Sequence, residues 1–329
     1  MKKICALVLA LALMLGAAGA SAKVVIYTGE AGGDDFTAFA KAASEATGVE
    51  IEGMAAPSNY SDFVPKITAM LSSNSDAVDI IWLDELLGVS FASAGYLEPI
   101  DAVIDEATKA QFSADVIDNI CSKDGVLYMI PSTATPMFLF VNKKLFEDAG
   151  IAYPINEEEF FAAAKALTNG DVYGYGASWS LGGMLFNDVI RWMDAYGGDY
   201  MDWTQEGSRK ALQAMHDMLY TDKITPVAAL GDTYDALNQK FIDGKYAMMY
   251  QWPYVYSVIG EDNFAQQYEV IPVPTFATNK TIVSGWQYAV NASSSNKEEA
   301  MKVIAWLASE EGQKLHITLH DVATARIDV

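Results

Sequence analysis

The chain has few cysteines and few histidines, and each shortage excludes a class of protein. Only Cys5 and Cys121 occur in 329 residues, and Cys5 falls in a segment that we expect to be removed, so no internal disulfide is expected. We predict Cys121 to be a buried or incidental thiol. The three histidines are scattered, and no H-E-x-x-H pattern accompanies His316 and His320, so no metal site is expected.

Basic residues are also scarce. Lysine and arginine total 21 against 43 aspartates and glutamates, which gives a formal net charge of −22. A surface this acidic disfavours nucleic acid and anionic membranes, so neither is expected as a partner. We interpret it as a solvated acidic surface, and attraction of cationic ligands is the alternative.

A long apolar run occurs at one place only, near the N-terminus. Lys2 and Lys3 precede the apolar residues 4–15, and the small residues that follow end in Ala20-Ser21-Ala22. This arrangement is typical of a cleaved secretory signal, so residues 1–22 are predicted to be a signal peptide and the mature protein to be periplasmic or secreted. The alternative is an uncleaved anchor, but the run is short for a bilayer span. Cys5 precedes the run, where a lipid-anchoring cysteine would not lie.

The motifs of several enzyme classes are missing as well. No G-x-S-x-G elbow, P-loop or G-x-G-x-x-G fingerprint occurs in a supporting context, so no cofactor is expected. A glycosidase pair of carboxylates stays open in principle, but no pair stands out. A glycan hydrolase therefore stays a minor alternative.

The order of strands and helices predicts an α/β fold. Apolar β-rich runs at residues 23–27, 49–54 and 78–83 alternate with amphipathic helical patterns, the first at residues 34–47. This order is the start of a doubly wound sheet, and the chain is long enough for two such lobes. Residues 124–142 hold two short apolar runs joined by small hydroxyl-bearing residues, which suggests a crossing between the lobes that can bend.

Ligands in doubly wound sheets bind at the carboxyl ends of the strands. That rule selects the loops and strand ends that carry Glu30, Tyr60, Trp82, Asp84 and Glu85. The carboxylates of Asp84 and Glu85 are suited to hydroxyl or ammonium groups, and capping of the following helix is the alternative.

Tryptophans in loops after strands indicate carbohydrate, because flat rings stack on the apolar faces of sugars. Trp179, Trp252 and Trp286 occupy such positions. A core role is always the default for tryptophan, and for Trp306, inside an amphipathic helix, we predict it.

Weak motifs in a specific order make the chain similar to a known family. The chain resembles the extracellular solute-binding proteins of ABC importers, family 1, in the branch that includes maltose and oligosaccharide binders. The motifs are Thr47-Gly48-Val49, Asp79-Ile80-Ile81, Ala94-Gly95-Tyr96-Leu97, Asp124-Gly125-Val126-Leu127-Tyr128, Val141-Asn142-Lys143-Lys144-Leu145-Phe146, Phe241-Ile242-Asp243-Gly244-Lys245-Tyr246-Ala247-Met248-Met249 and Ser309-Glu310-Glu311-Gly312.

The resemblance implies the two-lobed periplasmic-binding-protein fold of type II. Residues 23–132 with about 274–320 would form the first lobe and residues 136–273 the second, with hinge crossings at 132–136 and about 272–276. The hinge would close around a small-molecule solute, and the partners would be the transmembrane subunits of an ABC permease. A monomer is expected. The positions that correspond to ligand contacts in the family are Trp82, Asp84, Thr135, Trp179, Trp252 or Tyr254, and Trp286.

The chain departs from the family at its end. Residues 323–329 resemble the family's Pro-Thr-Arg loop, and the helices that normally complete the second lobe do not follow, so we expect a fragment or a truncated gene. The function that we predict is that of a binding protein, not an enzyme, which captures a sugar or oligosaccharide between two lobes and delivers it to a permease. The alternatives are a polyamine or other cationic solute bound by the same fold, and a secreted glycan hydrolase.

Overall fold

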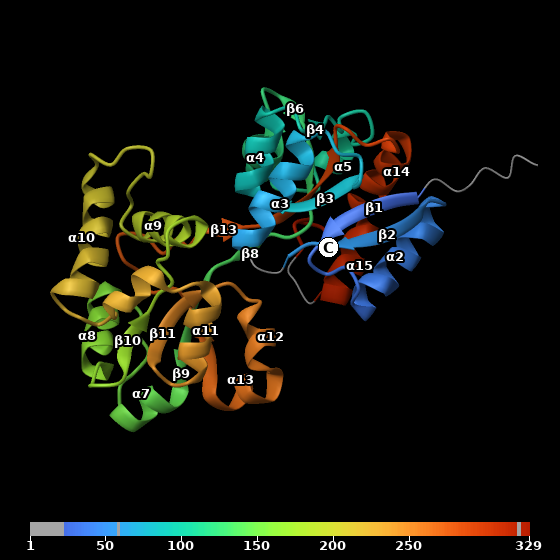
Figure 1. Cartoon of the computed structure of the whole chain (residues 1–329). Coiled ribbons are helices and arrows are strands. Elements are labelled where there is room, and N and C mark those ends of the chain that lie inside the picture. The colour runs from blue at the N-terminus through green and yellow to red at the C-terminus, as the bar shows by residue number, and fades with distance from the viewer. Residues whose placement is uncertain (1–22, 58–59, 321–323) are drawn as a thin grey trace, which may run out of the picture. The chain divides into compact units, whose positions relative to one another are not determined.

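The computed structural model describes residues 23–57, 60–320 and 324–329. The chain divides into unit 1, which contains residues up to Ala134 and from Gly285 onward, and unit 2, Thr135–Ser284 (Figure 1). The predicted signal peptide, residues 1–22, lies outside the described residues. None of the helices within those residues is long and apolar enough to cross a membrane.

Unit 1 alternates strands and helices in its first half and returns to the same sheet near the C-terminus. Its elements are β1 (Lys23–Thr28), α2 (Asp34–Thr47), β2 (Glu50–Ala55), α3 (Tyr60–Ser72), β3 (Ile80–Asp84), α4 (Glu85–Ser93), β4 (Leu97–Glu98), α5 (Glu106–Lys109), α6 (Ala114–Val116), the π-helical turn η1 (Ile117–Cys121), β5 (Ser122–Lys123), β6 (Val126–Leu127), β7 (Met129–Pro131), β14 (Trp286–Asn291), α14 (Lys297–Leu307) and α15 (Glu310–His320).

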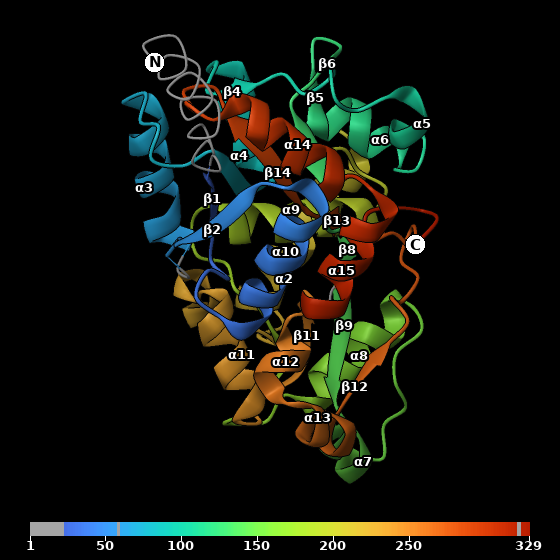
Figure 2. The ribbon, with the colours of Figure 1, turned by 90° about the vertical axis from the view of Figure 1, so that its right-hand side faces the viewer.

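The main sheet of unit 1 has the strand order β2-β1-β3-β14-β4, with β7 also paired to β14. β1 is parallel to both β2 and β3, whereas β14 runs antiparallel to β3, β4 and β7. The parallel βαβαβ start confirms the predicted doubly wound pattern. On one face of the sheet, α2, α14 and α15 pack side by side (Figure 2).

The helix α2 illustrates how sequence spacing builds this core. Phe36, Phe39, Ala40 and Ala43 recur at helical spacing, and all four are buried. The helix ends at Gly48, whose φ of 71° lies in the left-handed region that glycine adopts without strain. The free thiol of Cys121 is buried in the same unit, which confirms the prediction of a buried thiol.

Unit 2 has a smaller sheet than unit 1. Its elements are β8 (Thr135–Pro136), β9 (Phe138–Asn142), α7 (Lys143–Ala149), α8 (Glu157–Leu167), β10 (Tyr173–Gly176), α9 (Gly183–Ala195), α10 (Glu206–Tyr220), the 3-10 helix η2 (Val227–Gly231), α11 (Tyr234–Ile242), β11 (Tyr246–Gln251), α12 (Val255–Ile259), α13 (Glu261–Gln267), β12 (Tyr268–Ile271) and β13 (Val283–Ser284).

The sheet of unit 2 has the order β10-β11-β9-β12. All six residues of the central strand β11 are buried, and the strand is parallel to β10 and antiparallel to β9. β8 and β13 form a separate pair, in which Thr135 lies opposite Ser284. The chain passes between the units at the ends of this pair.

The second passage between the units differs from the prediction. It falls after Ser284 and not near residues 272–276, so residues 274–284 belong to unit 2. Backbone hydrogen bonds explain the difference, because Thr275 accepts from Glu157 N at 3.1 Å and Thr278 N donates to Ala195 O at 3.0 Å. The sequence of a polar turn does not indicate which of the two units the turn will pack against.

Candidate functional site

The carboxyl ends of the parallel strands in unit 1 gather six of the predicted residues at one edge of the sheet. Glu30 follows β1, Tyr60 begins α3, and Trp82 and Asp84 end β3 just before Glu85. β14 runs the other way, so Trp286 at its start lies opposite Asp84. The antiparallel return thus brings a residue from late in the chain to the same edge.

Aromatic rings dominate this edge. The ring centres of Trp82 and Trp286 lie 4.6 Å apart, and the two rings are tilted by 36°. The ring of Phe63 lies between Trp286 and Tyr60, with its centre 6.0 Å from the Trp286 ring and 6.2 Å from the Tyr60 ring. Trp82, Tyr60 and Trp286 are half-buried, so part of each ring surface is accessible. Such partly exposed rings offer large apolar area at low entropy cost.

Hydroxyl groups fix these two tryptophans in place. The indole N–H of Trp82 donates to Ser132 Oγ at 2.8 Å, and that hydroxyl donates to Trp286 O at 2.7 Å. Trp286 N donates to Thr133 Oγ1 at 2.9 Å. The small hydroxyl residues before the first passage between the units therefore hold the ring pair, a role that sequence reasoning missed.

Carboxylates lie beside the rings. Asp84 caps α4 by accepting from Leu87 N at 2.9 Å through Oδ1, so the capping alternative holds for this residue. Its Oδ2 is buried and has no hydrogen-bond partner among the described residues. A buried carboxylate oxygen left in this state costs free energy unless a further donor reaches it. Glu85 Oε2 accepts from Gly285 N at 3.3 Å.

The pKa of the Glu30 carboxyl is shifted from its ordinary value. Burial, with a contribution from the nearby charge of Asp35, raises the pKa of its carboxyl to about 7. Glu30 therefore exists as a mixture of neutral acid and carboxylate near neutral pH, and it can donate as well as accept a hydrogen bond.

Unit 2 carries a second cluster of polar and aromatic residues where β11 ends. The Trp252 indole N–H donates to Tyr234 OH at 3.1 Å, and Asn187 Nδ2 donates to the same hydroxyl at 3.2 Å. Tyr254, which is 42% exposed, accepts from Asn238 Nδ2 at 2.9 Å. Sequence reasoning found Trp252 and Tyr254 but missed the other three.

The two remaining predicted residues have different outcomes. Thr135 is half-buried in β8 at the first passage between the units. Trp179 is 2% exposed, and its indole N–H donates to the buried carboxylate of Asp188 at 2.9 Å. The prediction that Trp179 contacts ligand is therefore corrected, because its ring is enclosed in the core of unit 2 and offers no face for stacking.

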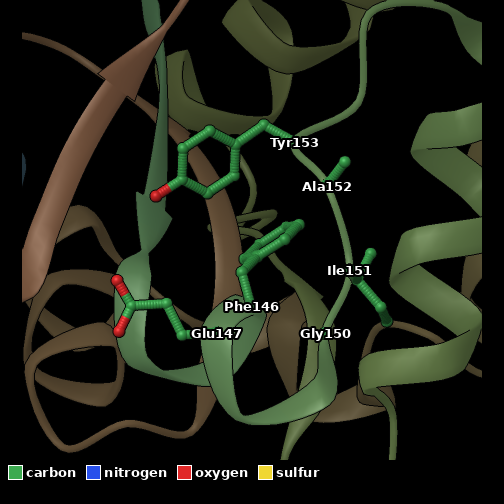
Figure 3. Close-up of a pocket in the computed structure, with 6 residues that line it drawn as sticks. All are labelled: Phe146, Glu147, Gly150, Ile151, Ala152 and Tyr153. Carbon is green, nitrogen blue, oxygen red and sulfur yellow. The ribbon is translucent and has the colours of Figure 1, made fainter.

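A shallow cavity of about 310 Å3 also occurs in unit 2 (Figure 3). It is lined by residues 146, 147 and 150–153, and the rings of Phe146 and Tyr153 lie 5.1 Å apart there. These residues follow the end of β9, which runs antiparallel to β11. The cavity therefore lies at the opposite end of the sheet from Trp252, and no predicted site residue lines it.

Metal-ligating side chains do not gather anywhere in the described ranges: no group of three or more histidine, cysteine, aspartate or glutamate residues is placed to hold an ion.

Comparison with known proteins identifies the class. A model of the family described as bacterial extracellular solute-binding protein matches residues 27–314, and the chain belongs to that family. A binding protein of Brucella abortus is 29% identical over 262 residues, which cover 75% of this chain and 62% of the relative. The chain thus spans less than two thirds of that relative's length.

Two further relatives carry ligand names. The maltotriose-binding protein of Pyrococcus abyssi is 24% identical over 242 residues, which cover 70% of this chain and 50% of the relative. The structure of maltose-bound MalE3 from T. maritima is 21% identical, covers 94% of this chain and 82% of its own, and has a TM-score of 0.79. The likeness confirms the predicted type II fold, and the family is one of binding proteins, as predicted.

Proposed function

We propose that this chain binds a carbohydrate and delivers it to the transmembrane subunits of an ABC permease. The observation that carries the proposal is the Trp82 and Trp286 ring pair, half-buried at the carboxyl ends of the strands of unit 1 beside the Asp84 carboxylate. The named ligands of the relatives, maltotriose and maltose, support a sugar. Neighbouring rings suit the apolar face of a pyranose, and carboxylates suit its hydroxyls.

The proposed contact residues come from both units. In unit 1 the rings of Trp82, Trp286 and Tyr60 would stack on sugar, while Glu30, Asp84 and Glu85 would bond its hydroxyls. A hydroxyl that reached Asp84 Oδ2 would supply the missing donor, which makes that contact worth more than an exposed one. In unit 2 the proposed contacts are Trp252, Tyr254 and Thr135.

We further propose that the protein is exported. Residues 1–22 would be removed as a signal peptide, and the mature chain would begin at Lys23 and act as a monomer in the periplasm or outside the cell. Bending would occur at the two passages between the units, next to Thr135 and Ser284, where only the short strands β8 and β13 pair.

A cationic solute such as a polyamine is the second candidate. It is favoured by the three carboxylates at one edge, Glu30, Asp84 and Glu85, and by the net charge of −22. Because burial raises the pKa of Glu30 to about 7, a cation would have to displace a proton from part of the Glu30 population near neutral pH, which lowers its affinity there. Affinity for a cation would weaken steeply with salt, whereas ring stacking would not.

The experiment is a thermal-shift screen of the chain from Lys23 onward against sugars, sugar alcohols, polyamines and amino acids. A ligand at 100 times its Kd adds about 2.7 kcal/mol to the free energy of unfolding, which shifts the midpoint by several degrees. We expect a shift with one sugar class, and Trp286→Ala should abolish it.

The matched control is Tyr96→Ala. Tyr96 is another half-buried ring of unit 1, but its backbone pairs with Ala292 just beyond the far end of β14. The Tyr96→Ala variant should show the same ligand-induced shift of the thermal midpoint as the wild type. A shift with polyamines alone would favour the second candidate, and a wild-type shift retained by Trp286→Ala would overturn the assignment of the ring pair.

A further inference from the structure

A group of exposed aromatic side chains in unit 2 remains unexplained by the site described above. Three rings share one region: Trp203 is 53% exposed, Tyr200 46% and Phe186 38%. Met201, in the same loop, is 77% exposed. Phe186 belongs to α9, and the other three belong to the loop that joins α9 to α10, drawn in yellow in Figure 1. Exposed apolar groups of this kind usually mark a binding surface.

The loop is held in a defined shape. Asp199 Oδ1 accepts from Met201 N at 2.8 Å, and Asp202 Oδ1 accepts from Thr204 N at 3.0 Å. Ser208 Oγ accepts from Asp199 N at 2.9 Å and so ties the loop to the first turn of α10. Side-chain bonds therefore order the backbone before any ligand arrives, which lowers the entropy cost of binding.

The rings themselves are also positioned. The Trp203 indole N–H donates to Tyr200 O at 2.6 Å, so the edge of the indole is fixed while about half of the residue stays exposed. The rings of Tyr200 and Phe186 lie 6.2 Å apart and nearly perpendicular, at 82°. The polar edge of the indole is satisfied within the loop, so the accessible area that remains is mainly the apolar ring, which suits stacking.

Helix α9 joins this surface to the cluster at the end of β11. Phe186 directly precedes Asn187 in α9, and Asn187 Nδ2 donates to the Tyr234 hydroxyl that also accepts from Trp252. The same turn of α9 thus carries Asn187, which contacts that cluster, and Phe186, whose ring contacts Tyr200. A ligand long enough to follow α9 would meet a second set of rings.

We propose that Phe186, Tyr200 and Trp203 form a second carbohydrate-contact surface that stacks on the distal sugar units of an oligosaccharide. The inference rests on the proposed function, and it names an oligosaccharide as the ligand class. Two acidic residues of the loop, Asp199 and Asp202, supply acceptors for sugar hydroxyls next to the rings. Hydrogen bonds from Thr204 lower the pKa of Asp202, which keeps that carboxylate ionised.

The test compares chain lengths. Isothermal titration with maltooligosaccharides and galactooligosaccharides of two to six units is carried out on the wild type and on the double variant Tyr200→Ala, Trp203→Ala. We expect wild-type affinity to rise with length, and the double variant to lose about tenfold for the longest members with less than a twofold change for the disaccharide. The control is Tyr220→Ala, which removes a ring 49% exposed at the other end of α10 and should change nothing.

The remaining outcomes separate this inference from the proposed function. Three outcomes would overturn the second surface and leave sugar binding standing. The wild type and the double variant could have equal affinities at every length, or the double variant could lose the same factor at every length. The third outcome is a wild type that binds only monosaccharides. A wild type that binds no sugar would overturn both. A concentration-dependent dimer that the double variant abolishes, with unchanged sugar affinities, would assign the rings to a second copy of the chain.

Discussion

Replacing Arg191 with methionine should strongly destabilise unit 2. The guanidinium is 2% exposed and lies 3.7 Å from the ring centre of Tyr250 and 4.0 Å from that of Trp192. Its Nε donates to Asp188 Oδ1 at 3.3 Å, and Asp188 also accepts from Trp179. Methionine fills similar volume but leaves a buried carboxylate without its counter-charge.

The loss can be estimated from those contacts. Removing one partner of a buried ion pair costs about 3–5 kcal/mol, because the other charge stays buried and uncompensated. Loss of the cation–π contacts adds about 1–2 kcal/mol at most. Urea denaturation followed by tryptophan fluorescence measures this, since Trp179 and Trp192 both lie in the network. The thermal midpoint of unit 2 should fall by roughly 10 °C or more.

The pH dependence of the variant's stability tests the ion pair more specifically than the size of the loss does. Burial raises the pKa of Asp188 and Arg191 opposes that rise, so the pKa should climb further in Arg191→Met. A group whose folded pKa exceeds its unfolded value loses stability as pH rises between the two values. The variant's deficit should therefore be smaller near pH 4.5 than at pH 8. Adding Asp188→Asn to the variant should restore part of the lost free energy of unfolding. A loss below about 1 kcal/mol in Arg191→Met, or no restoration by Asp188→Asn, would refute the ion-pair reasoning.

Two further predictions concern unit 1 and the packing of glycines. Glu30 has a folded pKa of about 7 against an ordinary 4.5, so the free energy of unfolding should fall as pH rises from 5 to 7.5, and Glu30→Gln should flatten that slope in urea titrations. Gly174→Ala would place a methyl group 2.0 Å from Ala164 O, whereas Gly88→Ala would meet the flexible Met129 side chain. Thermal melts should therefore show a larger loss in the free energy of unfolding for Gly174→Ala, about 1–3 kcal/mol, than for Gly88→Ala. Equal losses in the two variants would contradict this.

Sequence patterns predicted the secondary structure of unit 1 well because burial there follows simple periods. The apolar residues of α2 recur every three or four positions, and Ile80, Ile81 and Leu83 of β3 form the apolar run of a strand buried on both faces. Caps were equally local, as Asn142 accepts from Leu145 N and begins α7. Each of these signals lies within a few residues of its effect.

Side-chain pairing between different elements was harder to predict. Trp179 and Trp252 both follow apolar segments with small or polar neighbours, yet one is buried and the other half-exposed. The Trp179 indole donates to the buried carboxylate of Asp188 inside the core, whereas the Trp252 indole donates to the Tyr234 hydroxyl at the end of β11. Nothing near Trp179 in the sequence announces that partner.

The helix α9 explains why the polar half of the site in unit 2 escaped prediction. Successive residues of an α-helix point about 100° apart, so Asp188 can face the core while Asn187 faces Tyr234. Arg191, one turn later, returns to the core and fixes the rotation of the helix. The sequence around α9 is rich in aromatics and glycine, and neither Asn187 nor Asp188 stands out in it as a site or core residue. Their roles depend on Tyr234 and Tyr250, which belong to elements far along the chain. It follows that Arg191→Met should disturb the Asn187 contact as well as the core, so any sugar affinity that this variant loses without unfolding would measure how far the core positions the site.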